Sequence, residues 1–250
     1  MEPFVPLLKP TPETGPLLRV YLLGHVDFDR ALALQRALVY QATQDPETAA
    51  LVVCEHGPLI TVGRQGGPAH IRFSPDEWEA RRWPVRWVNR GGGCWLHLPG
   101  QLAVYPVLPL QRHGLGVRAY LTRLQLVLVD LLGDFGVQAK TRPDEAGVWV
   151  GSRPIAGVGV AVRDWVTYFG LTFNVHPDLV PFRSVQTSAG DDGPMTSLER
   201  ERHGPLRPAL VRERLLEHFA ARFAFARTAL FFNHPLLERP AGRANGVLQR

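Results

Sequence analysis

Lysine is almost missing from this sequence. Lys9 and Lys140 are the only two among 250 residues, so arginine supplies nearly all of the positive charge, and the net charge is +5. An excess of positive charge is compatible with binding to a nucleic acid or to an acidic protein partner. No dense basic cluster, helix-turn-helix, RNA-binding or zinc-finger pattern occurs, which argues against a nucleic-acid partner. The plain alternative is an arginine-rich surface that is simply solvated.

Cysteines and long apolar runs are also scarce. Cys54 and Cys94 are too few for a disulfide framework, which agrees with a reducing compartment. No apolar run reaches the roughly 18–20 residues of a membrane span. The first residues contain Glu2 and several prolines, where a signal peptide has a basic region and an apolar helix. We therefore expect a cytoplasmic protein with no membrane partner.

Signatures of cofactors and metals are lacking as well. No GxxxxGK[ST] loop is present to hold a nucleotide phosphate. The nine histidines are scattered, without His/Cys pairs at metal-ligand spacing, and Asp191 and Asp192 belong to a turn-like stretch. The sequence thus predicts no metal site and no cofactor.

Hydrophobic periodicity predicts a mixture of strands and helices. The predicted strands are 17–24, 49–57, 59–64, 84–90, 101–110 and 165–175, with a hairpin at 147–162 that turns at Gly151–Ser152. The predicted helices are 27–42, 117–132 and 208–223. Hairpins mixed with helices indicate an α/β fold of the α+β type, with a mixed or antiparallel sheet flanked by helices.

The domain organisation follows from this pattern. A length of 250 residues fits one domain, and no internal linker marks a boundary. We expect a Pro-rich N-terminal arm at 1–16, one domain at 17–232 and an irregular C-terminal tail at 233–250. Asp27 is a plausible helix N-cap, and Ser74 before Pro75 is a second helix start.

A glycine-rich segment carries the most chemical information. Arg90-Gly-Gly-Gly-Cys-Trp-Leu-His97 continues through Leu-Pro-Gly to Gln101. Glycines after a strand let backbone amides approach a ligand closely. Arg90 could bind a carboxylate or phosphate, and His97 could face the same cleft. The alternative reading is a tight turn between two strands.

This segment resembles a family signature. Residues 90–106 are similar to the pattern RGG-x-x-x-x-H-x-PGQ-x-x-x-YP of the lipoyl/octanoyl transferases, in the biotin/lipoate-ligase superfamily. Residues 55–71, 147–160, 168–182 and 195–201 resemble further elements of that family, in the same order. The resemblance covers roughly residues 17–225 and implies a biotin/lipoate-ligase-like fold.

The resemblance also implies a reaction. The family moves an octanoyl group from acyl carrier protein to a lysine of a lipoyl domain, through a thioester on a cysteine whose pKa a nearby lysine lowers. Acyl carrier protein and lipoyl domains are therefore the implied partners. The family's cysteine position corresponds to Ser188 here, and its lysine position to Pro154. Because the ATP-using ligase branch relies on the same lysine, Pro154 argues against that activity too.

The implied substrate-contacting residues lie in three segments. They are Arg90, Gly91, Gly92, Gly93, Cys94, Trp95, Leu96 and His97; Gly157, Val158 and Gly159; and Gly170, Leu171 and Thr172. Several neighbours depart from the family pattern. Trp95-Leu96 replaces Thr-Tyr, Leu98 replaces glycine and Phe169 replaces histidine. All these changes add bulk or remove polarity, which alters the shape of the expected acyl pocket.

Two hypotheses for activity remain. Ser188 could act as nucleophile with His97 as base, or be an ordinary loop serine. Cys94 could offer a thiol to the pocket, or be a small apolar filler, and we expect Lys140 on the surface. The protein is then either an octanoyltransferase with altered chemistry or a non-catalytic relative that binds an acyl group, acyl carrier protein or a lipoyl domain.

Overall fold

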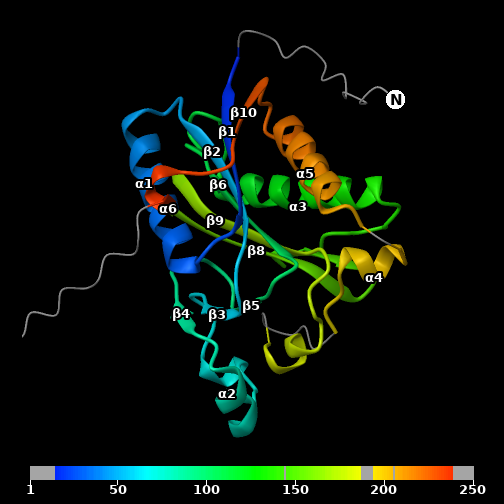
Figure 1. The fold of residues 1–250 in the computed structure, drawn as a ribbon. Helices are drawn as coiled ribbons and strands as arrows, with labels where there is room; N and C mark the ends of the chain where they lie inside the picture. Colours follow the sequence, from blue (N-terminus) through cyan, green and yellow to red (C-terminus); the bar gives the residue numbers. More distant parts are fainter. Residues whose placement is uncertain (1–14, 144, 187–193, 205, 239–250) are drawn as a thin grey trace, which may run out of the picture.

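The fold is built on one large and one small β-sheet (Figure 1). The computed structural model describes residues 15–143, 145–186, 194–204 and 206–238. The strands are β1 (Leu17–His25), β2 (Ala49–Glu55), β3 (Leu59–Val62), β4 (Val85–Trp87), β5 (Cys94–His97), β6 (Gln101–Val107), β7 (Gly147–Val150), β8 (Arg153–Arg163), β9 (Val166–Asn174) and β10 (Arg227–Phe231). The helices are α1 (Phe28–Gln44), α2 (Pro75–Arg81), α3 (Val117–Asp134), α4 (Leu198–Arg202), α5 (Pro208–Arg222) and α6 (Pro235–Glu238), with short 3-10 turns η1 (Pro68–His70) and η2 (Pro181–Ser184).

The large sheet is mixed, as the sequence predicts. Its strand order is β10-β1-β2-β6-β9-β8-β7. Strand β1 pairs in parallel with β2 and β10, whereas the remaining neighbours pair antiparallel. The β7–β8 hairpin turns at Gly151, whose φ of +60° suits a residue without a side chain. The predicted α+β architecture is therefore confirmed.

Helices cover both faces of this sheet. Figure 1 shows α3 and α5 on one side and α1 with α6 on the other. Leu124, Leu128 and Phe219 pack into the first apolar layer, and Leu34 and Leu38 into the second. Because both faces are buried, the central strands are apolar along their whole length, which explains the continuous apolar run of β2.

Helix starts follow the local chemistry that the sequence predicts. The Asp27 carboxylate accepts the N–H of Arg30 at 3.0 Å and caps α1. At α2, the Ser74 hydroxyl and the Glu77 side chain each accept the other residue's backbone N–H, which forms a capping box. No helix among the described residues is long and apolar enough to cross a membrane.

Several elements differ from the sequence prediction. The small sheet, in the order β4-β3-β5, contains Cys94–His97 as a strand, a stretch that the sequence indicates as part of a turn. Strand β10 extends the edge of the large sheet, and its partner β1 lies some 200 positions earlier in the chain, so local pattern could not reveal it. The described part of the predicted irregular tail contains α6, whose Leu237 packs against the layer beneath α1.

Helix α4 is tied to the β7–β8 hairpin by a half-buried carboxylate. Glu201 accepts two hydrogen bonds from the Arg153 guanidinium, at 2.9 and 2.8 Å, and one from the Thr196 hydroxyl. Burial raises the pKa of Glu201, but the hydrogen bonds from Arg153 and Thr196 outweigh it and leave that pKa below its ordinary value. The ionised form of Glu201 is therefore favoured by folding.

We expect Glu201→Gln to lower the free energy of unfolding at neutral pH by about 1 kcal/mol, a modest loss because Arg153 keeps part of its surface in water. Since the folded-state pKa is depressed, this contribution is complete above the unfolded carboxyl pKa and disappears as pH falls through the folded value. Urea unfolding of both proteins at neutral and acidic pH measures it. Glu217→Gln, at an exposed pair with Arg214, is the matched control and should change little. A Glu201→Gln loss that persists in acid would contradict the prediction.

Candidate active site

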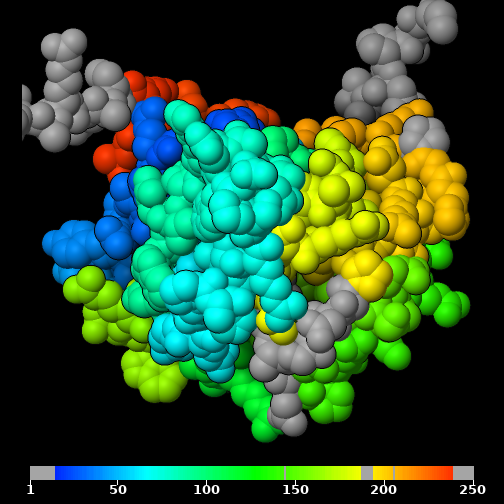
Figure 2. Space-filling model, turned by 90° about the horizontal axis from the view of Figure 1, so that it is seen from below, coloured from blue at the N-terminus to red at the C-terminus, as the bar shows by residue number. Residues whose placement is uncertain are grey.

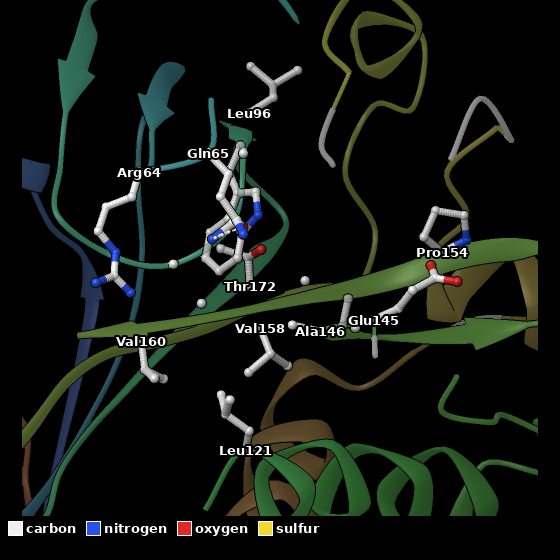
Figure 3. A pocket seen from close by; sticks show the side chains of 18 of the residues that line it. Arg64, Gln65, Leu96, Leu121, Glu145, Ala146, Pro154, Val158, Val160 and Thr172 are labelled. Atoms are coloured by element: carbon white, nitrogen blue, oxygen red, sulfur yellow. Dashed lines mark hydrogen bonds between the residues drawn. The ribbon is translucent and has the colours of Figure 1, made fainter. Parts of the chain in front are cut away.

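A cavity of about 850 Å³ lies where the small sheet meets β8. Figure 2 looks onto this end of the molecule, with the cyan region of β3 and α2 beside the yellow segment that follows β9. Figure 3 shows Arg64, Gln65 and Leu96 on one side of β8, Val158, Val160 and Leu121 on the other, and Pro154 with Glu145 at its far end. Because much of the wall is aliphatic, the cavity suits an apolar ligand with a polar end.

The glycine loop 91–93 forms one wall, and its carbonyl groups are held by the chain after β3. The carbonyl oxygens of Arg90, Gly92 and Gly93 accept the N–H groups of Arg64, Gln65 and Gly63 at 3.0–3.1 Å. A Cβ on Gly63 would lie 2.5 Å from the Gly92 oxygen, so the two backbones approach as only glycine allows. The Gly92 N–H donates to the Gln65 side-chain oxygen at 3.0 Å, an acceptor that a ligand oxygen could replace.

The Arg90 side chain lies behind this loop, only 1 % exposed. Its guanidinium donates to the carbonyls of Gly91, Gly93 and Thr61 and to the Thr61 hydroxyl, at 2.8–3.1 Å. Burial lowers the pKa of Arg90 to about 9, which leaves it charged at neutral pH. The side chain does not line the cavity. This corrects the expectation that Arg90 binds a ligand anion, because protein oxygens occupy its donors.

His97 is buried in the same network. Its Nε2 lies 3.0 Å from the Thr61 hydroxyl, which also accepts from Arg90. Burial, then the nearby His56 and Arg90, hold the pKa of His97 well below its ordinary value, so the ring is neutral. His97 is 3 % exposed and absent from the cavity wall. In the described structure it therefore holds the loop through Thr61 and does not face a ligand as a base.

Trp95 fills the space over the β8 glycines. A Cβ on Gly157 or Gly159 would lie 3.0–3.2 Å from indole atoms of Trp95. On Gly159 it would also lie 2.6 Å from the Gly91 oxygen. The Arg90 guanidinium carbon lies 3.7 Å from the indole centre, so the ring is fixed by a cation–π contact. Trp95 thus occupies the surface that Gly157 and Gly159 would otherwise offer to an acyl chain.

The other predicted binding residues divide between wall and core. Leu96, Val158 and Thr172 line the cavity. Leu171 is fully buried in the layer against α3 and α5. Gly170 faces β6, because a Cβ there would meet the Val104 oxygen at 2.1 Å. The β9 segment therefore contributes Thr172 to the cavity, while its two predecessors support the sheet.

Neither cysteine is placed as a nucleophile. Cys94 is fully buried, its Sγ lies 3.7 Å from the Gly67 oxygen, and burial raises its pKa. Cys54 is also buried, and burial, then Glu55, raises the pKa of its thiol. Since the thiolate is the reactive form, both groups are inert at neutral pH. This agrees with the reading of Cys94 as a packing residue.

The position that corresponds to the family's lysine supplies no cation. Pro154 lines the cavity and carries no charge. The neighbouring Arg153 is engaged with Glu201 and cannot replace a lysine there. Lys140 is exposed, as expected. Ser188 lies outside the described residues.

The sequence prediction missed the loop after β3. Arg64, Gln65 and His70 all line the cavity, opposite β8. Their signal was a second glycine-rich turn, Gly-Arg-Gln-Gly-Gly at 63–67, directly before η1. Among the described residues, no group of three or more His, Cys, Asp or Glu side chains is arranged to hold a metal ion.

Comparison with known proteins identifies the family. Residues 27–220 match the family model described as the lipoyl protein ligase A/B catalytic domain. The chain belongs to this family. An octanoyltransferase of Azotobacter vinelandii is 37% identical over 205 residues, which cover 82% of this chain and 90% of that protein. One from Syntrophobacter fumaroxidans is 38% identical over 180 residues, 71% of this chain and 78% of the relative.

Solved structures of this lipoyl ligase family share the fold. A crystal structure of lipoate-protein ligase A bound with ATP superimposes with a TM-score of 0.72 at 16% identity, over 88% of this chain and 90% of that one. A bipartite lipoate protein ligase from Thermoplasma acidophilum gives 0.67 at 16% identity, over 86% of both chains. At such low identity the likeness shows the fold alone.

Proposed function

We propose that this protein acts in protein lipoylation, binding an octanoyl group in the cavity beside β8 and transferring it from acyl carrier protein to a lipoyl-domain lysine in the cytoplasm. Family membership and the curated octanoyltransferase relatives support an octanoyl or lipoyl transfer role. The observation that carries the proposal is the cavity itself, whose apolar wall includes Leu96, Phe182 and Met195, which pack in one cluster. Apolar walls with a few polar groups are typical of sites for acyl ligands.

Contacts to the acyl group are assigned to a subset of the predicted residues. Loop 91–93, Trp95, Leu96, segment 157–159 and Thr172 line the cavity and are available to a ligand. Arg90, Cys94, His97, Gly170 and Leu171 would support that wall from behind. The aliphatic chain would run along the apolar wall, with its thioester at the polar end.

A non-catalytic relative is the second candidate, and a specific observation favours it. Pro154 provides no cation, Arg153 is engaged by Glu201, and Cys94 is buried as a thiol. A serine hydroxyl is a much weaker nucleophile than a thiolate unless a base removes its proton. Such a protein would bind the acyl group, acyl carrier protein or a lipoyl domain without transferring anything.

One assay separates the two candidates. Incubation with octanoyl-acyl carrier protein, followed by intact mass measurement with and without a lipoyl domain, should show slow octanoylation of the domain. Restoring the family pair with Pro154→Lys and Ser188→Cys should raise this rate about a hundredfold or more, because a thiolate supplies chemistry that binding cannot. Cys94→Ala, at a buried thiol, is the control and should leave the rate unchanged.

Each outcome is decisive. An adduct on the protein that disappears in Ser188→Ala supports a serine mechanism. No adduct and no transfer by the natural chain, with transfer by the double variant, establishes the non-catalytic state. Failure of every variant to bind or transfer an octanoyl group would refute octanoyl transfer and acyl binding, and would leave the second candidate only as a protein that binds acyl carrier protein or a lipoyl domain.

A further inference from the structure

His70 is the histidine whose ring lines the cavity without an assigned role. It ends the turn η1, and its ring is part of the cavity wall. The backbone around it is fixed, because the His70 carbonyl accepts the Gln186 N–H at 2.8 Å and the Arg72 N–H, two residues along, donates to the Ser184 carbonyl at 2.7 Å. An imidazole held in this way is preorganised for contact with a ligand.

One ring nitrogen of His70 is committed to the turn. The Gly67 N–H donates to Nδ1 at 3.0 Å. The Gly67 carbonyl lies 3.2 Å from the same nitrogen, but it already accepts the His70 backbone N–H at 3.0 Å. A backbone N–H can only donate, so Nδ1 must present a lone pair to it. In the neutral imidazole the hydrogen therefore resides on Nε2.

The two glutamine side chains of the wall are already engaged, whereas the described residues supply no hydrogen-bond partner for the Thr172 hydroxyl or the Trp95 indole N–H. The Gln65 side chain accepts the Gly92 N–H, and Gln101 accepts from the Leu98 N–H while donating to Asn174. Among the described residues, no hydrogen-bond partner is found for Nε2 of His70. This N–H thus has no described protein partner, it belongs to a half-buried residue that lines the cavity, and its natural complement is a carbonyl or carboxylate oxygen.

We propose that the Nε2–H of His70 binds the carbonyl oxygen of the acyl thioester, an inference that rests on the proposed function. When the amine of a lipoyl-domain lysine forms its bond to the carbonyl carbon, the C=O electron pair moves to the oxygen, where Nε2–H stabilises the negative charge. The C–S bond then breaks as the C=O bond of the new amide forms, and the thiolate leaves as a thiol with the proton that the amine loses.

Two substitutions of His70 that differ in side-chain length test whether Nε2–H donates to the thioester. Asparagine at position 70 can still accept the Gly67 N–H but offers nothing at the depth of Nε2, whereas glutamine extends an amide N–H to that depth. We expect His70→Asn to weaken binding of S-methyl octanethioate about tenfold, and His70→Gln to stay within about threefold of the natural protein. Methyl octyl sulfide, which lacks the carbonyl, should bind all three proteins equally. Octanoate in parallel shows whether the donor serves a carboxylate or only a thioester.

A spectroscopic measurement reports the hydrogen directly. With ¹⁵N-labelled histidine and His70→Asn for assignment, we expect a protonated Nε2 and an unprotonated Nδ1 at His70. The opposite tautomer, or thioester binding unchanged in His70→Asn, would overturn the inference while leaving the proposed function intact. If no eight-carbon ligand binds any of the proteins, the proposed function fails, and this inference fails with it.

Discussion

Replacing Arg90 by leucine should lower the free energy of unfolding by about 3–5 kcal/mol, a large part of the stability of a domain this size. The buried guanidinium donates to the carbonyls of Gly91, Gly93 and Thr61 and to the Thr61 hydroxyl. Leucine fills part of the volume but removes all four hydrogen bonds. The Gly93 carbonyl keeps the Gly63 N–H and the Thr61 hydroxyl keeps His97, so the loss falls most heavily on the Gly91 carbonyl, and a buried oxygen without a donor costs about 1–3 kcal/mol. Urea unfolding followed by fluorescence measures the loss.

The matched control is Arg86→Leu. Arg86 makes equally close hydrogen bonds, at 2.9–3.1 Å to the Asp29 carboxylate, but both side chains are exposed. We expect a change of about 1 kcal/mol or less there. Arg90→Lys separates charge from geometry. A single ammonium cannot reach the three carbonyls together, so it should also destabilise. An Arg90→Leu protein as stable as the Arg86→Leu protein would show that the loop does not depend on this side chain.

Trp95→Ala should enlarge the cavity and lengthen the acyl chain that it accepts. The indole lies over Gly157 and Gly159, so its removal opens the space above two residues without side chains. Each further methylene buried there should add about 0.8 kcal/mol of affinity. The natural protein should gain no affinity once the acyl chain exceeds the length that its cavity accepts. Binding of methyl thioesters with eight to fourteen carbons, compared between the two proteins, measures the shift.

Stability and a control complete this test. Truncation of a buried tryptophan costs about 3–5 kcal/mol, so Trp95→Phe provides a milder variant with a smaller expected shift in chain length. Trp87→Ala removes the same side chain from a surface position that is 65 % exposed and does not line the cavity. Trp87→Ala should change neither the free energy of unfolding nor the preferred length of the acyl chain. Identical chain-length preference in the natural and Trp95 variants would mean that the acyl chain does not pass over the β8 glycines.

Local signals in the sequence account for most of the secondary structure. The cap at Asp27, the capping box at Ser74 and the turn at Gly151 depend only on neighbouring residues, so the local sequence predicts them. Strand β10 and helix α6 were not predicted. Each is stabilised by contacts with β1 or α1 far away in the sequence, and no short window contains that information.

In the candidate site, too, the local sequence predicts some features and long-range contacts decide others. The glycine signature lies at the end of the molecule that contains the cavity, and Trp95 and Leu96 of this signature line it. The signature could not show that Arg90 and His97 turn away from it, toward Thr61. A motif records which residues occur together, but the side of the backbone that each one faces depends on strand pairing.

The sequence alone determined the family, the mixed sheet with its helices, and the absence of the family's cysteine and lysine at Ser188 and Pro154. Only the tertiary structure decided which polar groups reach a ligand. Pairing of β3 with β5 buries the Arg90 guanidinium among backbone carbonyls and brings the loop that carries His70 to the cavity wall. Buried donors and acceptors must find partners as the chain folds, so the groups left for a ligand are those that folding has not already used.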